Sequence, residues 1–430
     1  MAAYVWAVRN VRTHVVHLES KGGHNLVSVK LEIAQEILLN LVNVMPKERV
    51  ALQECWRRIL GETVTSDMDF PPFTRSPLDG YALIAEEVAT ATPENPVILE
   101  QIDYIPAGGN PSKTISAGTA SRIMTGAPIP PNATGVIRLE DTIVNGDSVS
   151  IVDGSGAEKN ICLQGEEIFL GEEVVSQGTI INFGVMGMLA VLGKSRPYVF
   201  RKPRVALIAT GSEIVPVDFP LAPGKIRNSN SYMLSAQVTE AGGQTVLMGN
   251  ASDNIEEIAH LLESASDCDL FVTTGGASVG DYDLIGEVYK KLGITLLFDR
   301  VSMKPGMPVL AGTRDGKLYL GLSGNPAAAA MSFEQLVRPV LMKMAGRKVW
   351  WRPRIKGILA SPFNKKTGAK RFVWARCWQA ETDMLVEPSR ALGNGMLKSA
   401  MGANALIVIP EDSPPLVVGT EVEVILLADA

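Results

Sequence analysis

The segment between residues 204 and 344 alternates short apolar runs with stretches of helical periodicity, and this alternation constrains the fold most. The apolar runs are RVALIAT, TVLMGNA, DLFVTT and ITLLFD. The helical patterns between them cover Ser229–Ala241, Ile255–Ser264 and Leu284–Lys291. Continuous apolar strands that alternate with helices are typical of βαβ units, whose buried parallel sheet carries helices on its faces. The segment is therefore predicted to be an α/β domain built on a parallel sheet.

Two further features complete this predicted domain. The runs VLAGT and LYLGL predict a closing hairpin. Asn325-Pro326 predicts the start of a long helix that reaches about Met344, because Asn caps helix N-termini well and Pro suits the first helical position.

The flanking regions predict different structures. Helical patterns cover residues 27–41, Ala51–Leu60 and Asn182–Leu192. Between residues 96 and 165, short β-like runs separated by Gly, Asn, Asp and Pro predict a small β-domain. After Trp350 alternating strands predict a C-terminal β-barrel or sandwich. Residues 1–26 show no sustained apolar pattern, and we expect an N-terminal extension that is open to disorder.

Composition excludes several classes of function. The four cysteines are widely spaced without a CxxC pair, and three of the four histidines precede residue 25, so neither a disulfide framework nor a multi-histidine metal site is indicated. A net charge of −6 disfavours a nucleic-acid partner. No apolar run approaches the roughly 18 residues that a membrane span needs. We expect a cytoplasmic protein that contacts neither nucleic acid nor membrane.

Polar loops follow the predicted strands, and ligands of open parallel sheets bind beyond the carboxyl ends of the strands. These loops contain Gly211-Ser212-Glu213, Ser252-Asp253, residues 275–283, Arg300 with Lys304-Pro305-Gly306, and Ser323-Gly324-Asn325-Pro326. Glycines allow close backbone approach, and helix N-termini favour anions. Carboxylates beside cationic side chains suit a phosphorylated substrate handled with a divalent metal such as Mg²⁺. The loops therefore predict one ligand site at one edge of the sheet.

Each of these residues also has a simpler interpretation. Asp253 begins D-N-I-E, which has the spacing of a capping box, and Asp283 also precedes a helix that it could cap. The glycine pair 275–276 could be a plain turn, as could Asp79-Gly80, and Glu213 and Lys304 could be solvated surface charges. The dinucleotide fingerprint GxGxxG and the phosphate loop GxxxxGK[ST] are both absent.

A series of motifs resembles the successive signatures of the MoeA family, also called the gephyrin E-domain family. The motifs are PPFTRSPLDGYA, RIMTGAPIPPNATGVIRLE, ATGSE, TTGGASVGDYD, RVSMKPGMP and GLSGNPAAA. The resemblance covers about residues 27–426 and implies a multidomain α/β protein. Its expected regions are the extension 1–26, an elongated helical domain from residues 27–50 and 166–202, an inserted β-domain 51–165, a molybdopterin-binding α/β domain 203–349, and a β-barrel 350–430.

The resemblance also implies an activity, that of a molybdopterin molybdenumtransferase. Such an enzyme cleaves adenylylated molybdopterin, inserts molybdate into the dithiolene and releases AMP, assisted by Mg²⁺. Family members are homodimers, and contact with the molybdopterin adenylyltransferase is transient. Alternatives left open are a tungstate-inserting paralogue and a non-enzymatic dimeric scaffold; the adenylylating sister activity is disfavoured, because that enzyme lacks the PPF-loop region and the barrel.

When residue roles are carried over motif by motif, the resemblance implies catalytic roles for Asp79, Glu213, Asp253, Asp283 and Lys304. Glu213, Asp253 and Asp283 would hold Mg²⁺, and Asp79 would come from the partner subunit. The residues implied to bind substrate are Thr210, Gly211, Gly275, Gly276, Ser278, Arg300, Pro305, Gly306, Ser323, Gly324, Asn325 and Pro326.

Several positions depart from the family pattern. They are Thr74, Glu167, Arg300, Met307, Ser323, Trp374 and Asn394. Trp374 stands where Arg is common, with Arg376 on the same strand face, and Asn394 stands near a frequent Ser. These two positions put the detailed oxyanion contacts in question.

Overall fold

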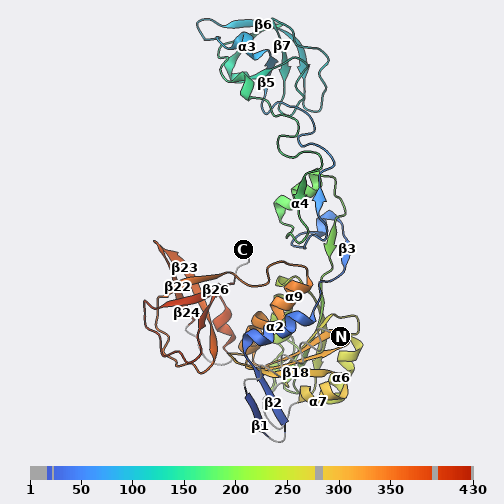
Figure 1. Cartoon of the computed structure of the whole chain (residues 1–430), viewed down its shortest axis with the longest axis vertical. Coiled ribbons are helices and arrows are strands. Elements are labelled where there is room, and N and C mark those ends of the chain that lie inside the picture. Colours follow the sequence, from blue (N-terminus) through green and yellow to red (C-terminus); the bar gives the residue numbers. More distant parts are fainter. Residues whose placement is uncertain (1–16, 22–23, 277–283, 390–395, 428–430) are drawn as a thin grey trace. The chain divides into compact units, whose positions relative to one another are not determined.

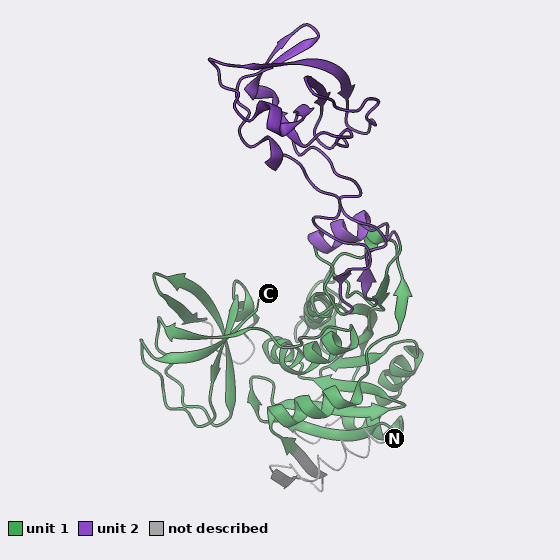
Figure 2. Ribbon diagram, turned by 45° about the horizontal axis from the view of Figure 1, so that its top comes forward, with its two compact units in different colours: residues 1–61, 178–182, 196–430 green, residues 62–177, 183–195 purple. Residues whose placement is uncertain are grey.

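The computed structural model describes residues 17–21, 24–276, 284–389 and 396–427. The chain divides into two compact units (Figure 2). The first contains residues 1–61, 178–182 and 196–430, and the second contains residues 62–177 and 183–195.

The first unit is built on an eight-stranded sheet with the order β1-β2-β18-β20-β21-β17-β13-β16. Four neighbouring strands are parallel: β16 (Gln244–Ala251), β13 (Arg204–Thr210), β17 (Leu270–Thr274) and β21 (Lys317–Leu322). The helices that connect or follow these strands are α5 (Asn230–Glu240), α6 (Ile255–Ser264) and α7 (Leu284–Lys291). The predicted βαβ arrangement is confirmed.

The large sheet is mixed, because it also contains the antiparallel hairpin that the sequence predicts. The expected hairpin forms from β20 (Pro308–Arg314) and β21, and it lies inside the sheet. β20 is antiparallel to β21 and also to β18 (Thr295–Val301). Two successive reversals return β18 to the direction of the parallel strands, so its carboxyl end reaches the same edge of the sheet as theirs.

Successive residues of β13 point to opposite faces of the sheet, as the period of a strand requires. Val205 and Leu207 join one buried core, and Ala206 and Ile208 join another. Side chains from α2 (Leu31–Leu41), α5 and α9 (Arg338–Met344) pack in the first core, and those from α6 and α7 pack in the second. Figure 1 shows α2 and α9 on one side of β18 and α7 on the other.

The structure of the N-terminal region differs from two predictions. β1 (His17–Lys21) pairs antiparallel with β2 (His24–Val29), and β2 pairs parallel with β18 through Ser28 and Val29. Part of the predicted extension therefore belongs to the sheet, and the helix expected over 27–41 begins only at Leu31. Val29 is fully buried, so the pairing with β18 removes apolar surface from water that a helical start would leave exposed.

The long helix predicted from Asn325 is confirmed. Asn325 caps it, its side-chain oxygen accepting hydrogen bonds from the amides of Ala327 and Ala328 at 3.1 and 3.3 Å. The helix runs through α8 (Pro326–Ser332), a π-helical turn (Phe333–Val337) and α9. The helix predicted over Ala51–Leu60 is wrong, since only a 3₁₀ turn forms there (Leu52–Glu54).

The C-terminal region forms the predicted β-barrel. Its strands are β22 (Arg354–Leu359), β23 (Lys370–Ala380), β24 (Asp383–Pro388), β25 (Ala405–Ile409) and β26 (Glu421–Leu426). Pairing of β23 with β25 closes the barrel, and β19 (Met303–Lys304) adds to its β23 side. A short 3₁₀ turn (Leu397–Ala400) precedes β25.

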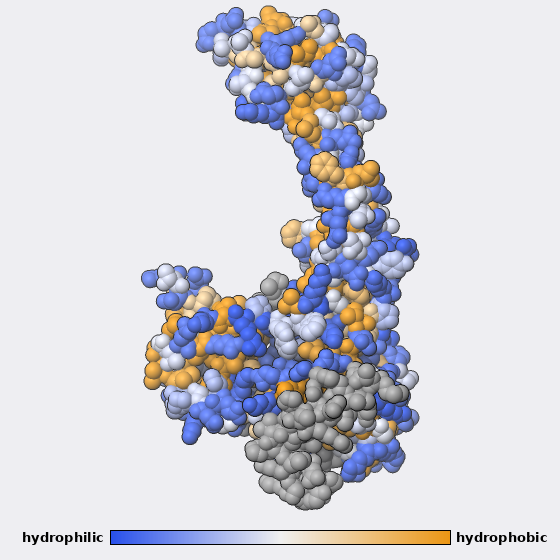
Figure 3. Space-filling model, viewed as in Figure 1, coloured by the Kyte–Doolittle hydropathy of each residue, from blue (hydrophilic) through white to orange (hydrophobic). Residues whose placement is uncertain are grey.

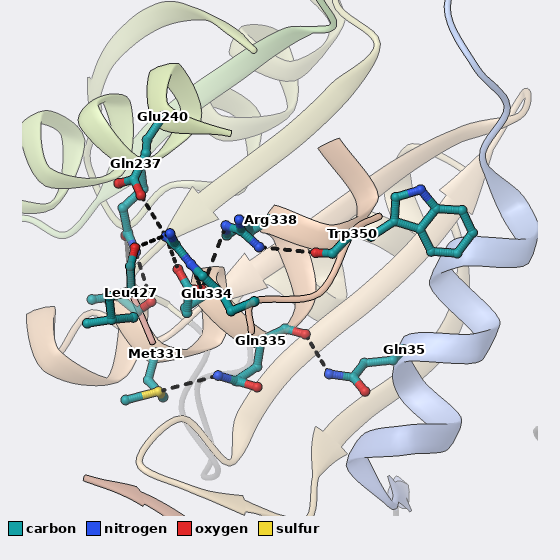
Figure 4. Close-up of polar contacts among 11 residues, drawn as sticks. Gln35, Gln237, Glu240, Met331, Glu334, Gln335, Arg338, Trp350 and Leu427 are labelled. Atoms are coloured by element: carbon teal, nitrogen blue, oxygen red, sulfur yellow. Dashed lines mark hydrogen bonds and ion pairs between the residues drawn. The ribbon is translucent and has the colours of Figure 1, made fainter. Parts of the chain in front are cut away.

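A buried ion network ties the start of the barrel to the helices (Figure 4). The Arg352 guanidinium donates to Glu334 on the π-helical turn, to Glu240 of α5 at 2.6 Å and to the carbonyl of Leu427. Arg338 donates to the carbonyl of Trp350 at 3.1 Å. One side chain thus connects the linker before β22, two helical segments and the residue after β26.

The second unit contains the predicted small β-domain. Its six-stranded sheet consists of β5 (Gly80–Leu83), β6 (Val97–Ile105), β7 (Thr119–Ile123), β8 (Gly135–Arg138), β9 (Thr142–Asn145) and β10 (Ser148–Ile151). The remaining elements of this unit are β4 (Val64–Thr65), α3 (Ala85–Val88), two 3₁₀ turns (Leu139–Asp141 and Ala157–Lys159), β11 (Glu173–Val175) and α4 (Phe183–Val191).

Two short strand pairs complete the first unit. They are β3 (Lys47–Arg49) with β12 (Tyr198–Phe200) and β14 (Ile214–Val215) with β15 (Ile226–Arg227). Among the helices that the structure describes, none is long and apolar enough to cross a membrane. On the face seen in Figure 3, hydrophobic residues are interspersed with hydrophilic ones.

Candidate functional site

The carboxyl ends of β13, β16, β17, β18 and β21 open at one edge of the sheet. These strands run in one direction, either as direct parallel neighbours or, for β18, through β20. The loops that leave this edge carry the residues predicted to form the ligand site in the first unit. Topology therefore brings these loops to a common edge, which we call the carboxyl edge.

A hydrogen-bonded bridge joins the loops after β13 and β16. The Asp253 carboxylate accepts a hydrogen bond from the amide of Ser212 at 2.9 Å, and the Asp253 amide donates to the Ser212 hydroxyl at 3.3 Å. Glu213 follows Ser212 and is exposed to solvent. A Cβ atom at Gly211, where φ is +146°, would lie 2.5 Å from the Glu213 carboxylate. The Glu213 carboxylate therefore lies close to the backbone at Gly211, whose positive φ favours glycine.

The capping interpretation of Asp253 is wrong, because the next residue caps α6. The side-chain oxygen of Asn254 accepts from the amides of Glu256 and Glu257 at 2.8 and 3.1 Å. Glu257 in turn accepts from the amide of Ser252 at 3.0 Å. Asp253 lies on the surface beside Ser212, and its carboxylate does not cap α6.

The loops after β17 and β21 pack against the end of β13 through glycine. Gly275 has a φ of +101°, and a Cβ atom there would lie 2.1 Å from the carbonyl oxygen of Thr210. Gly276 also has a positive φ, +64°. At Gly324 a Cβ atom would be in ordinary contact with Gly275, at 3.4 Å. The buried Thr210 hydroxyl donates to the carbonyl of Thr274 at 3.4 Å.

Asn230, which sequence reasoning missed, holds these two loops together. Its buried side-chain amide donates to the Thr274 hydroxyl at 2.6 Å and to the carbonyl of Gly324 at 2.9 Å, while Thr274 donates to the carbonyl of Ser323 at 3.2 Å. Within the described part of the chain, no donor reaches the side-chain oxygen of Asn230. The polar run NSNS at the start of α5 was the available signal, but its spacing matches no known motif.

The loop after β18 presents the predicted cation. Lys304 lies on β19 and is exposed, whereas Arg300, at the end of β18, is half-buried. The Lys304-Pro305 peptide bond is cis, and Gly306 has a φ of +98°. The hydroxyl of Ser332 in α8 donates to the carbonyl of Gly306 at 3.3 Å. Pro326, the first residue of α8, follows the cap Asn325, so both act in starting this helix.

Asp79 belongs to the second compact unit, in the loop before β5. Its carboxylate accepts from the hydroxyl of Thr125 at 2.7 Å and from the Thr125 amide at 2.8 Å. These hydrogen bonds, the hydroxyl's first, hold the pKa of Asp79 below its ordinary value, with a smaller contribution from the charge of Arg122. Asp79 is therefore an exposed carboxylate whose charged form is stabilised by Thr125.

Some predicted residues lie outside the described ones, namely Ser278, Asp283 and Asn394. Within the described ranges no three carboxylate, His or Cys side chains gather closely enough to hold a metal ion. Trp374 packs against the core beneath the sheet, and its indole N–H is buried without a partner among the residues described.

Three family models match the chain in succession. The MoeA N-terminal region (domain I and II) matches residues 29–193, the probable molybdopterin binding domain matches 206–343, and the MoeA C-terminal region (domain IV) matches 356–427. Each model covers a separate part, and together they span both compact units.

Similar proteins extend over almost the whole chain. A molybdopterin molybdenumtransferase of Staphylococcus epidermidis is 39% identical over 401 residues, which cover 93% of this chain and 95% of that protein. The molybdopterin molybdenumtransferase of Bacillus subtilis is 37% identical over 387 residues, 89% of this chain and 90% of that protein.

A solved structure has the same fold. The molybdopterin biosynthesis MoeA protein from Pyrococcus horikoshii OT3 is 31% identical, with a TM-score of 0.78 over 93% of this chain and 99% of that one. The ordered motifs, the arrangement of the regions and these similarities agree. The chain belongs to the MoeA family of molybdenum cofactor biosynthesis proteins.

Proposed function

We propose that the protein is a molybdopterin molybdenumtransferase, which cleaves adenylylated molybdopterin, inserts molybdate into the dithiolene and releases AMP. The observation that carries the proposal is the carboxyl edge, where the Ser212–Asp253 bridge, Glu213 and the Lys304 loop follow strands of one sheet. Carboxylates and a cation at one edge suit the cleavage of a phosphoanhydride, in which negative charge develops on the departing phosphate.

The described residues of the carboxyl edge would have different roles in this reaction. Lys304 would bind a phosphate or the incoming oxyanion. The backbone at Gly275 and Gly276 would let the substrate approach closely, because neither residue carries a Cβ atom. Asn230 would act as a positioning residue, since it holds the Gly324 loop to the end of β17.

Mg²⁺ is part of the proposal. One oxygen of Asp253 accepts from Ser212, which leaves the other oxygen available, and Glu213 is exposed on the adjacent loop. Oxygen donors of this kind are those that Mg²⁺ prefers, so Glu213 and Asp253 would hold it together with Asp283, which lies outside the described residues. The ion would neutralise charge on the leaving phosphate.

The proposal also includes the oligomeric state, a protein partner, the cellular compartment and the identity of the oxyanion. The protein would be a homodimer, with Asp79 entering the partner's site, and would meet the molybdopterin adenylyltransferase transiently. It would act in the cytoplasm, where its four cysteine thiols stay reduced. Molybdate and tungstate are tetrahedral dianions, so either could be the oxyanion inserted.

The test is AMP release and cofactor formation by the purified protein from adenylylated molybdopterin and Mg²⁺, with molybdate or tungstate in separate reactions. Lys304→Ala should abolish most AMP release. Lys356→Ala, which removes an exposed barrel lysine paired with Glu421, is the matched control and should leave it unchanged. Absence of AMP release from the folded wild-type protein with either oxyanion would reject the enzyme and favour the scaffold alternative.

A further inference from the structure

A cleft lies at the amino-terminal edge of the large sheet, at the other end of the strands from the carboxyl edge. Lys202, which precedes β13, and Gly242, which lies between α5 and β16, both line it, so the cleft is where these parallel strands begin. β13 is seven residues long, which separates the two edges of the sheet by roughly 20 Å. The cleft is therefore distinct from the proposed catalytic loops.

The segments around this cleft are rich in cations. Residues 47–58, 196–204 and 347–348 contain ten Lys and Arg residues but only two carboxylates, Glu48 and Glu54. This concentration of positive charge occurs in a chain whose net charge is −6. A surface with such a local excess of one sign attracts ligands of the opposite sign, so the cleft favours an anion.

Two carboxylates close to the cleft are already paired. Glu48 accepts from the guanidinium of Arg58, which is buried in the cleft wall and also donates to the carbonyl of Phe200 at 2.9 Å. Glu240, which lines the cleft, accepts from Arg352 at 2.6 Å. Neither carboxylate is therefore free to balance the other cations of the cleft.

Arg57 and Lys202 present positive charge to the cleft. Both are exposed, and neither makes an ion pair with a carboxylate among the residues that the structure describes. Cations can neutralise helix carboxyl ends, but backbone donors already serve the two helices that end here. The amide of Gly243 donates back to α5 at 2.8 Å, and that of Gly346 donates back to α9 at 3.0 Å. The two cations are thus left to bind an anion from outside the chain.

The backbone of Arg57 is held in the left-handed region, with a φ of +60°. Its amide donates to the carbonyl of Ile181 at 3.0 Å, and the amide of Arg58 donates to the carbonyl of Cys55 at 2.9 Å. Residues with a Cβ atom rarely adopt this conformation, which favours glycine. Strained residues of this kind cluster at functional sites, so the arginine here indicates a use for its side chain.

Trp56 adds an aromatic surface to the cleft. Its side chain is 52% exposed, although Trp is usually well buried. An exposed aromatic ring stacks well on planar bases, and neighbouring cations bind the phosphate that a nucleotide carries. The cleft volume of about 60 Å³ holds several water molecules or one phosphate group. A phosphate would therefore enter the cleft, while the base would lie over Trp56 at its mouth.

We propose that this cleft binds a nucleoside monophosphate, at a site separate from the proposed catalytic one. Arg57 and Lys202 would hold the phosphate, and the indole of Trp56 would stack on the base. The inference stands apart from the proposed function, because none of these residues belongs to the carboxyl edge. The AMP released in the proposed reaction belongs to the same class of ligand.

Photolabelling of the full-length protein with azido-AMP tests the site, because peptide mapping separates label in this cleft from label at the carboxyl edge. The wild type should be labelled in the peptide that contains Trp56. Arg57→Gly removes the cation and suits the backbone conformation, so it should fold and should weaken binding at this peptide by about tenfold. Arg49→Gln is the matched control, because Arg49 belongs to the same basic surface but lies over Tyr198 and outside the cleft. It should be labelled as the wild type is.

Competition with unlabelled AMP, adenosine and inorganic phosphate identifies the ligand class. AMP should compete best, because only AMP carries both the base and the phosphate. Labelling confined to the carboxyl edge, undiminished labelling of Arg57→Gly, or competition by phosphate as strong as that by AMP would overturn the inference. Since the readout is binding, a wild-type protein that is labelled in the cleft but releases no AMP would support this inference and reject the proposed enzyme.

Discussion

Asp253 and Asn254 are adjacent residues with separate roles at the carboxyl edge. Asn254 caps α6, whereas Asp253 accepts from the amide of Ser212. An Asn at position 253 can still accept this hydrogen bond but carries no charge. We therefore predict that Asp253→Asn lowers AMP release at saturating Mg²⁺ strongly, while stability changes by no more than about 0.5 kcal/mol.

The matched control is Asn254→Ala, which removes the cap and leaves the charge of Asp253 in place. It should lower stability by about 1 kcal/mol and leave AMP release near the wild-type rate. Thermal melts and AMP assays on both variants measure the contrast. Near wild-type turnover in Asp253→Asn would mean that its carboxylate is not needed for metal or substrate.

The hydrogen bonds of Asp79 predict that the stability of the fold depends on pH. Because its folded-state pKa lies below the ordinary value of 3.8, its hydrogen bonds stabilise the fold above that value, and this contribution is lost as pH falls through the folded-state pKa. Thr125→Val removes the hydroxyl donor and keeps the amide, so it should raise the pKa of Asp79. Carboxyl NMR titration measures this pKa. Asp153, whose pKa is lowered by Ser155, should stay unchanged as an internal reference; an unmoved Asp79 would contradict the assignment.

At the scale of elements, Arg352 links the barrel to the helices of the α/β domain through Glu334 and Glu240. Burial opposes its charge, but hydrogen bonds and charges from Glu334 and then Glu240 outweigh burial and raise its pKa. The side chains of Arg352 and Glu334 are each only 5% exposed. Removing one partner of such a pair leaves an uncompensated buried charge, so Arg352→Met should cost about 3–5 kcal/mol in the free energy of unfolding.

Arg354 offers a comparison two residues farther along the chain. Its ion pair with Glu423 is half-exposed, and Arg354→Met should cost no more than about 1 kcal/mol. Denaturant unfolding of both variants gives the two free energies. Equal, small losses would show that the buried network contributes little to holding the barrel in place.

At the scale of the whole molecule, the proposed catalytic residues are divided between the two compact units. Asp79 belongs to one unit and Lys304 to the other. If a homodimer builds each site from two chains, mixing Asp79→Asn chains with Lys304→Ala chains should restore AMP release, because one site of the mixed dimer keeps both residues. Dimer exchange is checked by differential tagging. Verified mixed dimers without activity would rule out a site shared in this way.

The sequence by itself determined the elements whose signal is local. The predicted bounds of α6 and α7 match the structure, and RVALIAT is β13 throughout, because amphipathic spacing and continuous apolar runs act within a few residues of each other. The order of motifs was also sufficient to indicate the family. Asn325 was predicted as a cap because its role depends only on the next three residues.

Only the tertiary structure decided what depends on distant partners. Residues 27–29 end β2 where the start of a helix was expected, because Val29 gains burial and β18 supplies its pairing partner. The same holds for Asn230, whose two acceptors come from loops far along the chain. Arg371 comes to lie beside Lys304 through the pairing of β19 with β23, and no local pattern encodes that register. Contacts between residues far apart in the sequence depend on tertiary packing. Local patterns among neighbouring residues contain no information about that packing, so they cannot predict these contacts.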